Sequence, residues 1–149
     1  MAYTDDFGLR AVYGLGADGK GELPNESGAQ NKYAVKQIVA DLSGITSTSA
    51  VQLKGAFLPK GSIILSAYLA VSKDASTNST TVDVGTCKLD GTTVDADGLV
   101  DGATLAAGGK VGAGAQINAQ VAYDEAITVL TSSAAGAAGH ESKLIIDYV

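Results

Sequence analysis

Four groups of residues in this 149-residue chain could do chemistry, and the first is a glycine-rich stretch. Gly14-Leu15-Gly16-Ala17-Asp18-Gly19-Lys20-Gly21 matches G-x-G-x-x-G and approaches a P-loop, in which glycine amides cradle phosphates. Both motifs require a helix directly afterwards, and the P-loop also requires Ser or Thr after the lysine. Gly21 and then Leu23-Pro24-Asn25 stand there instead, so we expect no nucleotide site.

The second group is an acidic stretch made of Asp90, Asp95, Asp97 and Asp101. Its Asp95-Ala96-Asp97-Gly98 is similar to the start of a calcium loop, in which alternate carboxylates bind one hard cation. The spacing departs from D-x-D-x-D-G, and no glutamate stands at the twelfth position. We therefore expect solvated aspartates that begin turns and no metal ligand, although the sequence leaves open whether the stretch binds an ion.

The remaining two groups are single residues, His140 and Cys87. His140 stands between Gly139 and Glu141, and Ser142 with an aspartate could complete a Ser-His-Asp set, but no G-x-S-x-G elbow accompanies it. Cys87 has no second cysteine, which excludes an internal disulfide and a cysteine-based zinc site. We expect a turn histidine and a small sheet residue, and therefore no catalytic residue and no cofactor.

The elements that position these residues follow from hydrophobic alternation with a period of two. It predicts strands at residues 33–39, 51–57, 62–72, 80–86, 117–123, 127–131 and 143–149. In the strand 62–72 it places one set of side chains on the inner face, namely Ile63, Leu65, Ala67, Leu69 and Val71. The polar turn 73–79 predicts a hairpin with 80–86, where Val82 and Val84 face inward. Glycine and aspartate in 90–114 predict a long loop with at most one short strand around 103–106.

This pattern predicts an all-β fold, an antiparallel β-sandwich and, with about eight strands, a jelly roll. Residues 33–149 would form the sandwich body. Residues 1–32 hold six glycines without strand or helix periodicity, so we expect an extended N-terminal arm there. Aromatic side chains spaced among glycines indicate that the arm contacts a partner, through Tyr3, Phe7, Arg10 and Tyr13.

Composition excludes two classes of partner. The net charge is −6, with one arginine and nine lysines, so the chain lacks the basic face that nucleic acid requires. No run of 18 apolar residues is present, and the first residues lack the basic start and apolar stretch of a signal peptide. We therefore expect no nucleic acid and no membrane as partner.

Three stretches resemble small structural proteins of tailed bacteriophages. They are Leu58-Pro59-Lys60-Gly61-Ser62-Ile63-Ile64-Leu65, continuing to Val71; Thr81-Val82-Asp83-Val84-Gly85-Thr86; and Asp95-Ala96-Asp97-Gly98-Leu99-Val100-Asp101. The terminal Lys143–Val149 also looks like the closing strand of these proteins. The resemblance covers residues 51–149. It implies a head decoration, or cement, protein: a jelly-roll-like homotrimer on the outer capsid surface of the virion, made in the host cytoplasm. Such a protein stabilises the shell by bridging neighbouring major capsid protein subunits, without enzyme activity or cofactor.

Two other functions stay open. A tail or fibre module with the same fold would bind host glycans through exposed aromatic residues, of which the body offers Tyr33, Tyr68, Tyr123 and Tyr148. A small hydrolase would depend on His140 with an aspartate and a serine. The sequence does not give the strand order, the lattice position, the copy number or the host.

Overall fold

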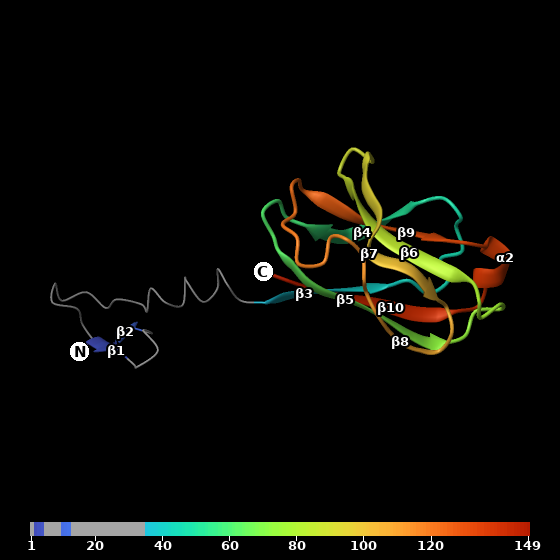
Figure 1. Ribbon diagram of the computed structural model, residues 1–149, viewed down its shortest axis with the longest axis horizontal. Helices are drawn as coiled ribbons and strands as arrows, with labels where there is room; N and C mark the ends of the chain where they lie inside the picture. The colour runs from blue at the N-terminus through green and yellow to red at the C-terminus, as the bar shows by residue number, and fades with distance from the viewer. Residues whose placement is uncertain (1, 5–9, 13–34) are drawn as a thin grey trace. The chain divides into compact units, whose positions relative to one another are not determined.

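The computed structural model describes residues 2–4, 10–12 and 35–149 (Figure 1). Strands β1 (Ala2–Thr4) and β2 (Arg10–Val12) pair antiparallel with each other, with Tyr3 opposite Ala11. We expected no strand in residues 1–32, so this short pairing differs from the prediction. The rest of the description concerns the sandwich, Lys36–Val149.

Eight strands form the sandwich, in two four-stranded antiparallel sheets. The first sheet has the order β3-β10-β5-β8, made of Lys36–Asp41, Glu141–Tyr148, Ile64–Lys73 and Gly108–Val111. The second has the order β4-β9-β6-β7, made of Val51–Leu58, Glu125–Thr131, Thr81–Lys88 and Thr93–Thr104. Successive strands cross between the sheets, except for the pair β6–β7. This is the order of a jelly roll, so the predicted fold class is confirmed.

The core lies between the two sheets, and the central strands contribute most of it. In β10 the alternation places Leu144 and Ile146 inside with no exposed surface, and in β6 Val82 and Val84 face inward as predicted. The described part of the chain has a single short helix, α2 (Ala134–Ala137), capped by the Ser133 side chain. In that part no helix has the length and hydropathy of a membrane span. Aliphatic side chains between the sheets therefore stabilise the fold.

The predicted hairpin between 62–72 and 80–86 is wrong. β5 pairs with β10 and β8, whereas β6 pairs with β9 and β7, so residues 74–80 cross from one sheet to the other. The reason is that alternation in each strand specifies a buried face but not the strand opposite it.

The inner face of β5 is also only partly as predicted. Ala67, Leu69 and Val71 are buried, but Ile63 and Leu65 are about two-fifths exposed and Ile64 is buried in their place. The pairing of β5 with β10 skips Leu65, since Tyr148 lies opposite Ile64 and Asp147 opposite Ser66. A β-bulge inserts one unpaired residue, which moves every side chain before it to the other face.

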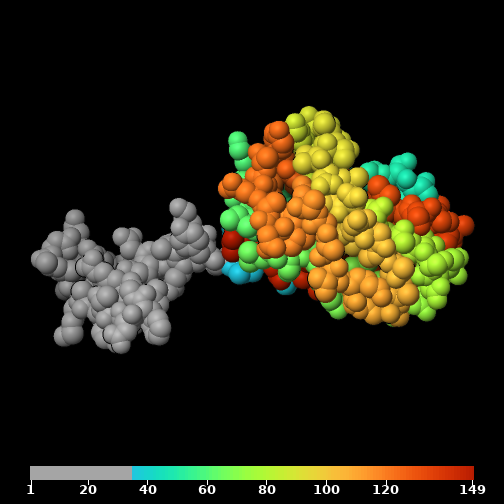
Figure 2. Space-filling model, viewed as in Figure 1, coloured from blue at the N-terminus to red at the C-terminus, as the bar shows by residue number. Residues whose placement is uncertain are grey.

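Two further strand assignments are corrected by the structure. The expected loop 90–114 contains β7 and β8, and β7 tolerates its glycines and aspartates as an edge strand with three register shifts against β6. The expected strand 117–123 is instead a turn followed by an isolated bridge from Gln120 to Ile63. Asn118 has a positive φ of 65°, which interrupts extended backbone. In Figure 2 this segment is coloured orange and lies on the visible face of the sandwich.

Candidate interaction surface

On one side of the sandwich, an edge strand of the first sheet, β3, lies next to an edge strand of the second sheet, β4. β3 is the outermost strand of one sheet and β4 that of the other. Each therefore has another strand on one side only, which leaves backbone donors and acceptors available along the other. An open edge of this kind can be extended by a strand from another chain.

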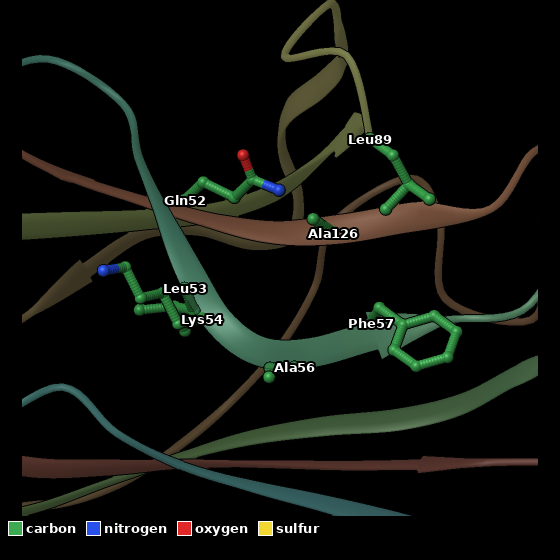
Figure 3. A pocket seen from close by; sticks show the side chains of 8 residues that line it. Gln52, Leu53, Lys54, Ala56, Phe57, Leu89 and Ala126 are labelled. Carbon is green, nitrogen blue, oxygen red and sulfur yellow. The ribbon is translucent and has the colours of Figure 1, made fainter.

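β4 does not follow its neighbour β9 continuously. Gln52 lies opposite Thr128 and Phe57 lies opposite Ala126, so four residues of β4 face a single residue of β9. Residues 53–56 therefore bend away from the sheet, and we call them the β4 arch (Figure 3). Gly55, with φ of 79°, lies in the arch and adopts a backbone conformation that favours glycine.

The β4 arch borders a cavity on each side. The cavity facing β9 has a volume of about 630 Å³, and Phe57, Leu89 and Ala126 line it with the arch (Figure 3). Phe57 is 51% exposed and Leu89 is 60% exposed, so the cavity has an apolar mouth. Lys54 supplies the only charge in its lining. A second cavity of about 490 Å³ lies between the arch and residues 37–41 of β3.

A second apolar surface crosses the outer face of the first sheet. The register places one residue from each strand in a row, which we call the apolar row: Val39, Ile145, Tyr68 and Val111. Val39 is 58% exposed and Val111 is 78% exposed. Polar residues flank the row, since Asp147 accepts hydrogen bonds from Gln37 and Ser66 at 2.9 and 3.0 Å. Apolar patches rimmed by polar side chains are typical of protein interfaces.

Two of the tyrosines considered for glycan binding, Tyr68 and Tyr123, are exposed and have a neighbour against the ring. A Cβ placed on Gly109 would meet the ring of Tyr68, so this tyrosine lies over β8. The Lys88 ammonium lies 4.1 Å from the centre of the Tyr123 ring. Tyr148 is partly buried, and Tyr33 lies outside the described residues. These contacts occupy ring surfaces that a sugar would need.

The aspartates of the acidic stretch are distributed along a turn and an edge strand. Asp90 accepts a hydrogen bond from the Thr92 amide at 2.9 Å, which lowers the pKa of its carboxyl, and it begins a turn as predicted. Asp95, Asp97 and Asp101 all lie in β7. Desolvation and the neighbouring Asp97 raise the pKa of Asp95. Within residues that the structure describes, no three acidic, histidine or cysteine side chains are arranged to hold a metal.

His140 is buried rather than exposed, and carbonyl oxygens face both of its ring nitrogens. Nδ1 lies 2.7 Å from the carbonyl oxygen of Ala137, and Nε2 lies 2.9 Å from that of Leu42. The Ser142 hydroxyl is buried with no hydrogen-bond partner in the described structure. His140 thus joins the end of α2 to the loop after β3, and the geometry assigns it to structure rather than to a Ser-His-Asp set.

Cys87 lies in β6 and is buried, in agreement with its prediction as a small sheet residue. Burial raises the pKa of its thiol, and the carboxylates of Asp90 and Glu125 raise it further. A nucleophilic cysteine requires the opposite shift, since the thiolate is the reactive form.

Of the predicted arm residues, Tyr3 lies in β1 and Arg10 in β2, while Phe7 and Tyr13 lie outside the described residues. The glycine-rich stretch 14–21 lies outside them as well. The β4 arch and the apolar row were not found by sequence reasoning. Gly55 inside a strand pattern is a signal that could have indicated the arch, because such a glycine often marks a bulge.

Residues 36–149 form a jelly-roll sandwich with two exposed apolar surfaces. No model of a known protein family matches the chain, and no curated protein does. Solved structures of capsids do match. A chain of the Ralstonia phage GP4 capsid has a TM-score of 0.57 and 20% identity, covering 77% of this chain and 83% of that one.

Two further capsids contain a similar chain. One is the acidic stable capsid of Helicobacter pylori bacteriophage KHP30, with a TM-score of 0.54, 19% identity, and coverage of 76% of this chain and 86% of that one. The other is the cyanophage Pam1 capsid asymmetric unit, with a TM-score of 0.53, 15% identity, and coverage of 77% and 84%. This chain therefore shares its fold with chains found in three phage capsids.

Proposed function

We propose that this protein is a virion structural protein that decorates a phage capsid and stabilises it by bridging neighbouring major capsid protein subunits. The observation that carries the proposal is the fold likeness to chains of three phage capsids, which spans more than four-fifths of each of those chains. A protein with this task requires a rigid body and exposed adhesive surface, and no reaction.

The apolar row is the surface that we assign to the shell. It extends across all four strands of one sheet, so a partner seated on it would contact a stiff, continuous face. Burying exposed aliphatic side chains such as Val39 and Val111 stabilises an interface by roughly 25 cal/mol per Å² of apolar surface removed from water. A copy attached to two subunits binds more tightly than it would to one, because its second contact forms within the complex.

The same proposal includes the arm, the assembly and the location. Residues 1–32 form an arm separate from the body 33–149, and its Tyr3, Phe7, Arg10 and Tyr13 contact partners. The protein assembles as a homotrimer on the outer capsid surface after synthesis in the host cytoplasm. The fold likeness to a capsid chain supports the location in a virion, and the exposed apolar side chains support contacts with other subunits and between copies.

Binding to emptied heads that lack this protein tests the proposal. We expect saturable cosedimentation of the purified chain with such heads, and heads that resist heating better once it is bound. Val111→Asp should lower the affinity at least tenfold, because it introduces a charge at the exposed end of the apolar row. Thr48→Asp is the matched control, since it adds the same charge at an exposed loop position.

Absence of saturable binding would refute the proposal. Binding to a glycan array instead of heads would favour the tail or fibre module. Equal loss of affinity in Val111→Asp and Thr48→Asp would refute the assignment of the apolar row.

A further inference from the structure

A small cavity lies between the segment 116–122 and the start of β9, and it has a volume of about 120 Å³. Its lining includes exposed Gln120 and Ala122 as well as buried Ile64, Val121 and Glu125, so it leads from the surface to Glu125. One water molecule takes up roughly 30 Å³ in the liquid. The cavity therefore admits a slender group of several heavy atoms.

The Glu125 carboxyl is buried with a single hydrogen bond. Its side chain is 1% exposed, and in the described residues only Gln116 donates to it, from Nε2 to Oε2 at 3.3 Å. The same nitrogen donates its other hydrogen to Thr86 Oγ1 at 2.8 Å, so Gln116 has no second donor for Glu125. A buried carboxylate costs free energy unless donors or an opposite charge compensate it. Oε1 thus remains available to a further donor.

No basic side chain in the described part of the chain supplies this compensation. The single ion pair found there joins Lys73 and Glu141, which are both exposed. Lys88 lies opposite Glu125 in the pairing of β6 with β9, but its ammonium lies 4.1 Å from the centre of the Tyr123 ring. A cation from outside this part of the chain would complete the site.

The lining of the cavity selects among cations. Calcium takes about six to eight oxygen ligands, and among the described residues no three acidic, histidine or cysteine side chains gather to supply them. A guanidinium pairs best with both oxygens of a carboxylate at once, but Oε2 already accepts from Gln116. An ammonium is a point charge that one free oxygen can bind. Most of the other walls are apolar and suit an alkyl chain, namely Ile64, Val94, Ala119, Val121 and Ala122.

We infer that this cavity binds a primary ammonium on a slender alkyl chain, and that the Glu125 carboxylate pairs with the charge. A lysine side chain of a partner protein and a free alkylamine both carry this group. The inference does not depend on attachment to a shell, because the cavity and the carboxyl belong to one chain.

Titration of the full-length chain with n-butylammonium tests the inference, with binding followed by the NMR shifts of backbone amides. We expect saturable shifts confined to residues around the cavity and a higher melting temperature in the presence of the amine. n-Butanol has the same chain without the charge and should bind at least tenfold more weakly. Nα-acetyl-lysine amide distinguishes the two sources. If it binds, the site accepts a lysine side chain, whereas binding of n-butylammonium alone assigns the site to a free amine.

Matched variants separate the charge of the cavity from its shape. Glu125→Gln should lower the affinity for n-butylammonium at least tenfold, since it removes the charge and keeps the size of the side chain. Glu141→Gln is the control and should leave the affinity unchanged, because it removes the same charge at an exposed position. Ala119→Leu should also weaken binding, because it fills the cavity and leaves the carboxyl in place. Circular dichroism establishes that each variant folds, and Ala119→Leu still tests the site if Glu125→Gln does not fold.

Three results would overturn the inference. They are a titration with n-butylammonium that causes no saturable shift at the cavity, equal affinities of Glu125→Gln and Glu141→Gln, and binding of n-butanol as tight as that of the amine. A chain that binds n-butylammonium but not emptied heads would refute the proposed function and leave this inference intact.

Discussion

Replacement of His140 measures how much one buried side chain contributes to the stability of the fold by joining the end of α2 to the loop after β3. The ring is 3% exposed, and both of its nitrogens face carbonyl oxygens. A neutral imidazole carries one N–H and can donate to only one of them. The Leu42 carbonyl also accepts a hydrogen bond from the Ile45 amide at 3.1 Å, whereas no backbone amide in the described structure donates to the Ala137 carbonyl. For a neutral ring we therefore place the proton on Nδ1, toward Ala137.

This assignment fixes the order of three variants. His140→Leu leaves the Ala137 carbonyl buried without a donor, so we expect a loss of about 1–3 kcal/mol in the free energy of unfolding. His140→Asn positions an amide nitrogen near the place of Nδ1 and should recover about 1 kcal/mol of that loss. His140→Gln positions its amide near the place of Nε2, toward Leu42, and should recover less.

Urea denaturation followed by circular dichroism gives these free energies, provided that the slope with denaturant is the same in all variants. A Gln variant more stable than the Asn variant would refute the assignment of the proton. A Leu variant as stable as the wild type would refute the structural role itself.

Three further predictions concern the sheets. Leu69→Asp should lower the free energy of unfolding by at least about 3 kcal/mol because it buries a charge. Leu65→Asp should lower it by less than about 1 kcal/mol, because Leu65 faces outward at the β-bulge. Equal losses in urea denaturation would contradict the bulge. Gly85→Ala should cost about 1–3 kcal/mol, since its Cβ would meet the backbone of Asp95 in β7, and an unchanged calorimetric melt would show that the strands lie further apart. Asp95→Asn should raise the melting temperature at neutral pH. Burial and the neighbouring Asp97 raise the folded-state pKa of Asp95, so ionisation of its carboxyl lowers the stability of the wild-type protein as the pH rises. Below about pH 3.9 the carboxyl is protonated in both the folded and the unfolded state, so the higher melting temperature of the Asn variant should vanish there. A higher melting temperature at every pH would contradict this origin.

Much of the fold was accessible from the sequence because alternation is a local property. Residues 143–149 read as a strand with Leu144 and Ile146 inside, and both are fully buried. The same is true of Val82 and Val84. A chain with several such strands and almost no helix propensity can bury their apolar faces in few ways other than by packing two sheets together.

The acidic strand β7 shows where sequence reasoning was misled. Asp95, Gly98 and Gly102 are all residue types that strands disfavour, yet they lie in one. β7 is at the edge of its sheet and has three register shifts against β6, which accommodate these residues. Propensity does not report whether a strand has one neighbour or two.

The sequence alone determined that this protein is a β-sandwich, that its central strands alternate, and that its charge does not suit nucleic acid. Only the tertiary structure decided that β5 and β6 belong to different sheets, that Leu65 faces outward, and that Phe57 and Leu89, 32 positions apart, meet at one cavity. The physical reason is that side-chain direction within a strand depends on adjacent residues, whereas strand order, bulges and cavities arise from pairing between segments distant in the chain.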